Sequence, residues 1–599
     1  MIGTIMNRRD FLKVGAAAAT ATHARAAQSP AAPLTEFSYD AVSLTGGPLK
    51  RQYDHLHQHF LALDNDRLLK VYRQRAGLAA PGDDMGGWYD ADGFVPGHTL
   101  GQFISGLSRI YSTTKDPACA RKVNALVDGF ATTLGPGGYP YASEKAAITW
   151  PCYILDKYEA GLLDASRLAS SPVARMLLVE VIKGAIPHIP DHTYDRTPDS
   201  PKQAPYDEPY ILPENLFNAH ALTGDKKYLD MARLYLLDHE YFDPLAQNKN
   251  LLPGKHAYSH MIALSSGARA YEVLGDVKYL NAIRNAWDMI VQTQQFASGG
   301  WGPKEAFVTP GEGKLGESLT TTREHFETPC GCYAQTKLAR YLLRFTGEGR
   351  YGDGLERIVY NALAASKDPG ADGEYFYYSD YQSGARKGYY KKKWPCCSGT
   401  LLQSVADYVL DIYFARGQSI YVNLYTPSQV RWNAGRVPVT LSQETDYPND
   451  SQIGFVIRVP QTVEFSLKLR IPGWVQSGAK LSVNGKSADI PTTPGTFAEI
   501  SRRWRDGDTV ELTLPLDFRA EPIDDKHPER VALMRGPQMM VAANATPELS
   551  ETPLILPGRP VAISPKDSKF TLSGAAGPVE IMPFREVREE TYTTYLRRA

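Results

Sequence analysis

The 599-residue sequence predicts a multidomain α+β protein in which a toroid of about a dozen helices precedes β-sandwich domains. Helical periodicity dominates as far as about residue 415, where short runs with strand-like alternation replace it. Within the helical part, joints built on Gly and Asp recur, which is typical of repeated helical hairpins. A chain of this length also exceeds what one hydrophobic core supports, so we expect two or three domains.

The N-terminus predicts export. Arg8 and Arg9 precede a short apolar run at residues 14–21, and Ala24-Arg25-Ala26 matches an Ala-x-Ala cleavage site. This combination is typical of a twin-arginine (Tat) signal peptide, here residues 1–26, and predicts a periplasmic or secreted protein. The alternative is a basic N-terminus that arises by accident. The formal net charge of −1 gives no indication of a nucleic-acid partner, and no other segment could span a bilayer.

Residues 34–415 are expected to form the helical domain. Gly224-Asp225 is echoed by Gly275-Asp276, with looser copies at residues 345–351 and 111–116. In each joint the glycine ends one helix and the acidic residue caps the next. Such hairpins build a closed toroid or an open solenoid, and the long Gly-rich loops favour closure around a central pocket. Amphipathic patterns predict helices at residues 98–112, 122–134, 147–163, 173–185, 213–222, 226–237, 256–274, 277–293, 330–345, 355–365 and 400–414.

Residues 416–529 are expected to form a β-sandwich, and residues 530–599 a second, small β unit. Asn484-Gly485 and Asp506-Gly507 are typical turns of antiparallel hairpins. We expect both units to support the functional site rather than form it. Strand patterns occur at residues 41–44, 420–424, 437–441, 454–459, 465–471, 480–483, 497–500, 508–514, 531–534 and 539–542.

Candidate metal ligands gather in one sixth of the chain. Four of the six cysteines lie between residues 299 and 399, in the company of two glutamates: Cys330, Cys332, Cys396, Cys397, Glu305 and Glu327. Thiolates with a carboxylate indicate a soft-metal site, most plausibly Zn²⁺. Disulfides are the alternative in an oxidising compartment, as Cys330–Cys396 or Cys332–Cys397 bridges. Cys119 and Cys152 lie in helical patterns and are expected to be buried thiols.

The same region offers catalytic groups. A metal ion or nearby positive charge would make a nucleophilic thiolate from the Cys396-Cys397 pair. Glu305 follows a Gly-Gly-Trp-Gly loop, where a carboxyl can be aimed into a pocket and can protonate a leaving group. Basic residues at positions 386–393 form either a solvated loop or an attractor for an anionic substrate.

These motifs resemble the family 127 glycoside hydrolases, the β-L-arabinofuranosidases and their relatives. The likeness rests on Gly-Gly-x-Gly…Glu-Ala-Phe at residues 299–307, Glu-Thr-x-Cys-Gly-x-Tyr at 327–333 and Cys-Cys at 396–397. It implies an (α/α)6 barrel followed by β-sandwich domains. It also implies Cys396 as nucleophile, Glu305 as general acid/base, a zinc site of Glu327, Cys330, Cys396 and Cys397, and sugar-binding residues His260, Tyr377 and His98. Cys332 is an alternative metal ligand.

The leading hypothesis is therefore an exported retaining glycoside hydrolase, similar to β-L-arabinofuranosidases, that acts on an oligo- or polysaccharide. One alternative keeps the barrel but makes it a hydrolase or lyase of acidic, uronic glycans with a structural metal. The other is a non-catalytic sugar-binding protein in which the cysteines only hold zinc.

Overall fold

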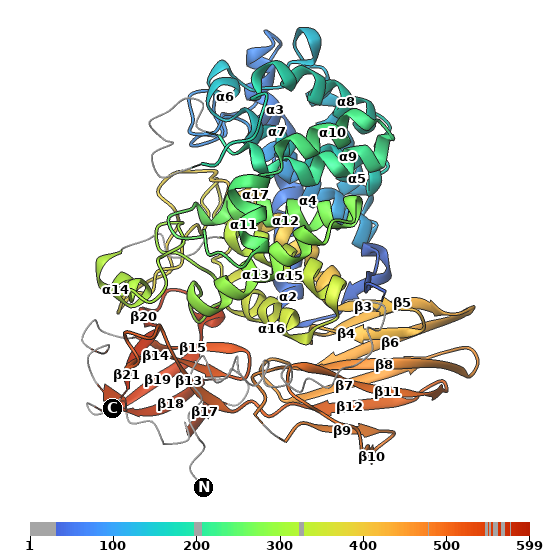
Figure 1. Ribbon diagram of the computed structural model, residues 1–599, viewed down its shortest axis with the longest axis vertical. Helices are drawn as coiled ribbons and strands as arrows, with labels where there is room; N and C mark the ends of the chain where they lie inside the picture. The colour runs from blue at the N-terminus through green and yellow to red at the C-terminus, as the bar shows by residue number, and fades with distance from the viewer. Residues whose placement is uncertain are drawn as a thin grey trace.

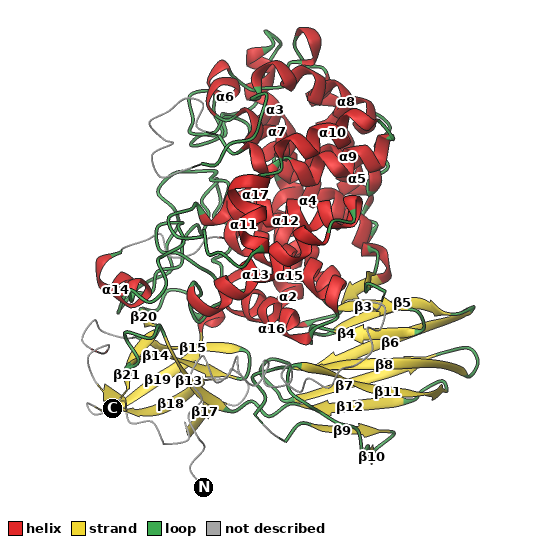
Figure 2. Cartoon of the chain, in the orientation of Figure 1, coloured by secondary structure: helices red, strands yellow, loops and turns green. Residues whose placement is uncertain are grey.

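The computed structural model describes residues 32–196, 207–322, 329–476, 478–544, 549, 553–554, 561–564, 569–574 and 577–598. The predicted signal peptide and the candidate ligand Glu327 lie outside these ranges. A helical domain lies above two separate β units, one on the right and one on the left of Figures 1 and 2. Among the described helices, none is both long enough and apolar enough to cross a membrane.

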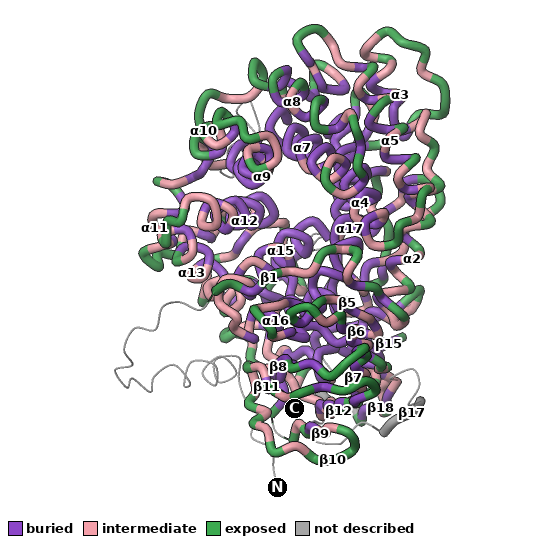
Figure 3. The backbone as a smooth tube through the Cα atoms, turned by 90° about the vertical axis from the view of Figure 1, so that its right-hand side faces the viewer, coloured by how far each residue is buried: buried purple, intermediate pink, exposed green. Residues whose placement is uncertain are grey.

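Six inner helices form a closed ring. Neighbouring helices pack against one another in the order α4-α7-α9-α12-α15-α17, and α17 packs back onto α4. Figure 3 shows the six around a common centre. Their bounds are α4 Thr99–Thr114, α7 Pro151–Arg167, α9 Pro213–Thr223, α12 Ala257–Leu274, α15 Pro329–Thr346 and α17 Cys397–Ala406.

Six outer helices cover this ring, one on each inner helix. The contacts pair α2 with α17, α5 with α4, α8 with α7, α10 with α9, α13 with α12 and α16 with α15. The predicted closed helical barrel and the α+β class are therefore confirmed. The outer helices are α2 Gly47–Ala62, α5 Pro117–Ala131, α8 Ala174–Ala185, α10 Lys226–Tyr235, α13 Val277–Thr293 and α16 Gly349–Ile358. Shorter helices lie at α3 Asn65–Arg75, α6 Glu144–Thr149, α11 Asp243–Ala246 and α14 Lys314–Thr321.

The two closest copies of the repeated joint have the predicted geometry. In the looser copies the prediction holds only in part, because Lys115 takes the left-handed position of the glycine and Glu348 makes no side-chain cap bond. Gly224 and Gly275 take left-handed conformations, with φ of 77° and 74°, where a side chain would be strained. The carboxylate of Asp225 accepts the amide of Lys227 at 3.0 Å and so caps α10, and Asp276 caps α13 in the same way.

One helix prediction is wrong. The helix expected at residues 400–414 ends at Ala406, and after a 3-10 turn the first sandwich strand, β3 Tyr413–Arg416, begins. A continuous apolar run does not distinguish a buried helix from a buried strand, so its periodicity alone misplaced this boundary.

The sandwich consists of a five-stranded sheet, β1-β3-β4-β8-β11, and a seven-stranded sheet, β10-β9-β12-β7-β6-β5-β2. The start of the chain belongs to it, because Thr35 pairs with Ala415 and Val42 with Val430. Its strands are β1 Thr35–Glu36, β2 Val42–Leu44, β3, β4 Ser419–Val422, β5 Ser428–Ala434, β6 Val437–Thr445, β7 Gln452–Arg458, β8 Val463–Ile471, β9 Lys480–Val483, β10 Lys486–Ser487, β11 Thr496–Trp504 and β12 Thr509–Thr513.

A buried ion network joins the sandwich to the barrel. Arg470 on β8 is fully buried, and its guanidinium meets Asp353 and, at 2.8 Å, Glu356 of α16. Its Nε–H donates to the carbonyl of Asn423 at 2.6 Å. Charges withdrawn from water in this way are tolerable only because every partner is present.

The third sheet braces the loops at the mouth of the barrel. The amide of Ala297 donates to the hydroxyl of Tyr595 at 2.9 Å, and the amide of Tyr592 donates to the carbonyl of Ala385 at 2.8 Å. This sheet thus supports two loops of the barrel. The strands of this sheet are β13 Phe518–Pro522, β14 Arg530–Arg535, β15 Gln538–Ala543, β16 Pro553–Leu554, β17 Val561–Ser564, β18 Lys569–Gly574, β19 Gly577–Pro583, β20 Tyr592–Thr593 and β21 Tyr595–Arg598.

Candidate active site

The N-terminal ends of the inner helices meet at one end of the barrel. Five of the inner helices, α4, α7, α9, α12 and α15, are each followed by the outer helix that packs on them, so these five run in the same direction. The sixth, α17, starts beside the start of α15, where the sulfur of Cys397 lies 3.2 Å from that of Cys330. The residues at or near their starts include His98, Tyr153, Tyr258, Cys330 and Cys396. Helix N-termini carry partial positive charge, and a site where several of them converge stabilises a thiolate or another anion.

Three thiols converge there. The sulfur of Cys330 lies 3.2 Å from that of Cys396 and 3.2 Å from that of Cys397, and all three side chains are buried. All six cysteines are free thiols, so the alternative of disulfide bridges is wrong. Three sulfur atoms within 4.8 Å of one another are a fitting donor set for zinc or another thiophilic cation.

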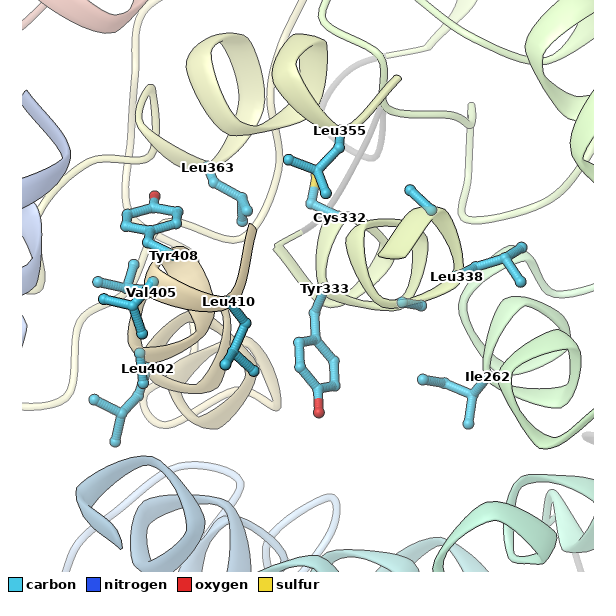
Figure 4. Close-up of a cluster of buried hydrophobic side chains, with 14 of the residues drawn as sticks. Ile262, Cys332, Tyr333, Leu338, Leu355, Leu363, Leu402, Val405, Tyr408 and Leu410 are labelled. Carbon is cyan, nitrogen blue, oxygen red and sulfur yellow. The ribbon is translucent and has the colours of Figure 1, made fainter. Parts of the chain in front are cut away.

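Cys332 does not join this group. Two residues along an α-helix turn the side chain by about 200°, so Cys330 and Cys332 point to opposite sides of α15. Figure 4 shows Cys332 directed towards Leu355, within the apolar layer between α15 and α16. Glu327, the fourth predicted ligand, lies outside the described residues.

Cys396 is the thiol that the surroundings most favour as an anion. Hydrogen bonds from Cys330 and Cys397 hold the pKa of Cys396 well below its ordinary value. Burial and the interaction with Cys396 raise the pKa values of Cys330 and Cys397 instead. One negative charge among the three sulfurs is therefore concentrated on Cys396.

Glu305 is aimed by an unusual loop. Lys304 and Glu305 both have left-handed backbones, with φ of 59° and 57°, a conformation that costs about 1–3 kcal/mol for a residue with a side chain. The loop is held by the amide of Ala257, the first residue of α12, which donates to the carbonyl of Glu305 at 2.8 Å. Burial raises the pKa of the Glu305 carboxyl, which favours its protonated, acid form.

Tyr377 connects the two predicted catalytic residues. Its hydroxyl donates to Glu305 Oε1 at 2.9 Å and lies 3.8 Å from the sulfur of Cys396. Because the same hydroxyl oxygen makes both contacts, the distance from the Cys396 sulfur to Glu305 Oε1 cannot exceed the sum of these two distances. The ring of Tyr377 stacks on Tyr390 with centroids 4.6 Å apart, and Trp88 lies 6.0 Å away. Such aromatic walls suit the apolar faces of a sugar ring.

His98 offers an unused hydrogen-bond acceptor. Its Nδ1 lies 2.6 Å from the carbonyl of Val95 and must donate there, so Nε2 carries the lone pair. Burial lowers the pKa of His98 to about 4 and keeps the ring neutral. Nε2 is buried and has no partner among the described residues.

His260 is placed differently. Both of its ring nitrogens are occupied within the protein, Nδ1 by the carbonyl of His256 and Nε2 by Asp195, each at 2.8 Å. No free nitrogen is left for a sugar. His256, one helical turn earlier, lies beside the Glu305 loop, and its Nδ1 lies 2.8 Å from Oε1 of Glu208. Sequence reasoning missed His256, although it stands at the same i, i+4 spacing on the same helix face.

Two further acids and a lysine were also missed. Asp195 and Glu208 hold the two histidines and also pair with Lys255 and Arg196. Lys157 on α7 is buried, donates to Asp156 at 2.6 Å and lies 4.5 Å from the ring centroid of Tyr153. Its signal in the sequence was a run of charged residues inside an otherwise apolar helix.

A polar cavity of about 170 Å³ extends along the centre of the ring, from Lys157 and Tyr258 towards the C-terminal ends of the inner helices. Arg167 and Arg344 lie at that far end, where cations complement the helix dipoles. Figure 4 shows Tyr333 directed into the same central space. The central cavity is therefore lined by polar side chains at both of its ends.

Three residues of the basic run are engaged in contacts within the protein. Lys387 is buried and donates to the carbonyls of Phe584 and Val587, and burial lowers its pKa to about 7. Arg386 donates to the carbonyl of Glu589, and Lys393 pairs with Asp372 at 2.5 Å. These three side chains secure loops, whereas Lys391 and Lys392 of the same run are exposed.

Comparison with known proteins decides the family. The model of the β-L-arabinofuranosidase GH127 catalytic domain matches residues 41–409, and that of the GH127 middle domain matches residues 419–516. The chain belongs to glycoside hydrolase family 127. The resemblance drawn from the sequence motifs is thereby confirmed, and with it the class of enzyme, a glycoside hydrolase.

Relatives of this family 127 chain are distant in sequence. It is 24% identical over 378 residues to the non-reducing end β-L-arabinofuranosidase of Bifidobacterium longum subsp. longum. The alignment covers 53% of this chain and 55% of that enzyme, so the chain spans about half the length of this curated relative.

Two solved structures share the fold. A GH127 β-arabinofuranosidase has a TM-score of 0.75 at 19% identity, over 96% of this chain and 99% of that one. A GH127 β-L-arabinofuranosidase from Geobacillus stearothermophilus T6 has a TM-score of 0.71 at 18% identity, over 93% and 100%. At these identities the likeness establishes the architecture and leaves the substrate to be argued from the site.

Proposed function

We propose that this family 127 chain is a retaining glycosidase similar to β-L-arabinofuranosidases, with Cys396 as nucleophile and Glu305 as general acid/base. The observation that carries the proposal is the Tyr377 hydroxyl, 2.9 Å from Glu305 and 3.8 Å from Cys396. A nucleophile and an acid at such close range suit two-step retention, for which paired carboxyl groups stand about 5–5.5 Å apart.

In the first step the Cys396 sulfur attacks the anomeric carbon and forms a C–S bond. The glycosidic C–O bond breaks, and Glu305 gives its proton to the leaving oxygen. In the second step Glu305 takes a proton from water, whose oxygen attacks the same carbon while the C–S bond breaks and the thiolate is released. Two inversions give net retention.

Cys330, Cys396 and Cys397 would hold a zinc ion, with Glu327 as the proposed fourth ligand. When bound, the ion stabilises the thiolate form of its cysteine ligands at neutral pH. The three sulfurs converge without forming a disulfide, and this donor set fits the metal.

The substrate is proposed to be an oligo- or polysaccharide with a terminal furanose. His98 Nε2 supplies an acceptor for a hydroxyl, and Tyr377, Tyr390 and Trp88 form the aromatic wall. His260 is proposed to orient Asp195 rather than to bind the sugar directly, since both of its nitrogens are occupied.

Intact-protein mass spectrometry tests the nucleophile. Brief incubation with a β-L-arabinofuranoside that carries a 4-nitrophenolate leaving group should add one sugar mass to Cys396, located by peptide mapping. Cys396→Ser should show no adduct, whereas Cys332→Ser, which removes the sulfur outside the cluster, should retain it. An adduct on another residue, or turnover by folded Cys396→Ser at the wild-type rate, would refute the assignment.

Export by the Tat route remains a proposal that rests on residues 1–26. Expression in a bacterium followed by fractionation should recover chains that begin at Ala27 outside the cytoplasm. Replacing Arg8 and Arg9 together by lysine should leave full-length chains in the cytoplasm, and equal export of that variant would contradict the proposal.

A further inference from the structure

A second group of metal-ligand atoms lies between two outer helices. His57 on α2 places Nε2 3.1 Å from the sulfur of Cys119 and 3.2 Å from Oδ2 of Asp116. Asp116 caps α5, and Cys119 lies in its first turn. The three donor atoms all lie within 4.8 Å of one another. This group shares no residue with the thiol cluster of the catalytic site.

Hydrogen bonding leaves one imidazole nitrogen to serve both the carboxylate and the thiol. An imidazole Nε2 has either one proton or one lone pair, so it can donate to the carboxylate or accept from the thiol, but not both. The other carboxylate oxygen, Oδ1, is already occupied by the amide of Ala118 at 2.9 Å. A cation at the centre removes the conflict, because nitrogen, sulfur and carboxylate oxygen can then all direct lone pairs towards it.

The separations match a tetrahedral ion. With metal–ligand bonds of about 2.0–2.3 Å, two ligands of tetrahedral zinc lie about 3.3–3.6 Å apart. The separations of 3.1 and 3.2 Å lie close to this range and need only a small adjustment. Cys119 is fully buried, whereas the side chains of His57 and Asp116 are 16% and 30% exposed. Water can therefore reach the remaining coordination position.

We propose that His57, Asp116 and Cys119 form a second metal site, for zinc or a comparable thiophilic divalent cation. A mixed nitrogen, oxygen and sulfur donor set favours zinc over magnesium or calcium, which prefer oxygen ligands alone. As the metal–sulfur bond forms, the Cys119 thiol releases its proton to solvent, so charge and atoms balance. The ion would cross-link α2 to α5, two outer helices that pack against each other.

Zinc stoichiometry tests the site without reference to hydrolysis. Metal-free full-length protein is titrated with Zn²⁺ against a chromophoric chelator, and the equivalents that bind tightly are counted. We expect two for the wild type, one for His57→Ala and one for Cys330→Ser. Cys152→Ser is the matched control, because it removes a buried thiol on α7 that belongs to neither group, and it should keep two.

A thermal-unfolding series provides the second measurement. In the Cys330→Ser background, Zn²⁺ should still raise the unfolding temperature, and adding His57→Ala should abolish the increase. His57 is partly exposed, so its replacement leaves the core packing intact even if Cys119→Ser does not fold. Loss of no zinc in His57→Ala relative to the wild type, or a Zn²⁺-induced increase that persists in the double variant, would overturn the proposal. Neither outcome depends on whether Cys396 is the nucleophile.

Discussion

Replacement of Tyr377 by phenylalanine removes one oxygen from the centre of the site. That oxygen donates to Glu305 at 2.9 Å and lies 3.8 Å from Cys396, while the ring stacks on Tyr390. Phenylalanine retains the ring and its stacking. The change therefore isolates the hydroxyl and leaves the wall of the pocket in place.

The size of the effect follows from the charge on the acceptor. As Glu305 gives up its proton, the Tyr377 hydroxyl stabilises the carboxylate that develops, and a hydrogen bond to a charged group contributes about 1.5–3 kcal/mol. At 1.4 kcal/mol per factor of ten, kcat/KM should fall by about ten- to a hundred-fold.

The pH dependence should change in a defined direction. Burial raises the pKa of Glu305, and the hydrogen bond from Tyr377 opposes that rise. Without the hydroxyl, the pKa of Glu305 increases further, so its acid form persists to higher pH. Because the first step needs this acid form, the high-pH limb of kcat/KM should move to higher pH.

The assay is the pH profile of kcat/KM on a 4-nitrophenyl furanoside for wild type and Tyr377→Phe. Tyr375→Phe is the matched control, because it also removes one buried hydroxyl, two residues away in the chain. That hydroxyl contacts His59 at 3.0 Å. An equal loss in both variants, or a limb that stays in place or moves to lower pH, would refute the reasoning.

Three further predictions follow from the packing and the thiol cluster. Arg470→Met leaves two buried carboxylates without their cation and should destabilise the protein by about 3–5 kcal/mol, seen as a lower thermal unfolding temperature; an unchanged transition would contradict the role of the network. Cys330→Ser should lose bound zinc at the catalytic site, whereas Cys332→Ser should retain it by elemental analysis; equal loss in both would place Cys332 among the ligands. Gly101→Ala brings a methyl group into the backbone of α7 and should destabilise the protein by about 1–3 kcal/mol in the same thermal assay, whereas Gly388→Ala, in open space, should be neutral.

Much of the architecture could be predicted because it depends on short-range chemistry. The joint at Gly224-Asp225 contains both a helix stop and a helix start, and the structure uses each residue for that purpose. The change of period near residue 415 marks the passage from barrel to sandwich, although the apolar run after Ala406 hid the place where the helix ends. Strand β5 was also missed, although apolar and polar residues alternate from Val430 to Ala434.

Only part of the site could be predicted from the sequence. Motif spacing singled out Cys396, Glu305 and Tyr377, and these side chains lie in one hydrogen-bonded line. Spacing could not predict the contacts of His256 and His260, one turn apart on the same helix. The acids that reach these two histidines come from other segments of the chain. Asp195 and Glu208 lie about fifty to sixty-five residues away in the chain and carry no motif.

By itself, the sequence determined the order of helices and strands, the family, and the residue types that can perform sulfur and carboxylate chemistry. The tertiary structure decided which of these side chains face the pocket. It brought Cys330 to Cys396 while turning Cys332 into the apolar layer, and it buried Lys387 against the C-terminal sheet. The physical reason is that helical periodicity is a property of neighbouring residues, whereas the side that faces the pocket is set by contacts between segments far apart in the chain.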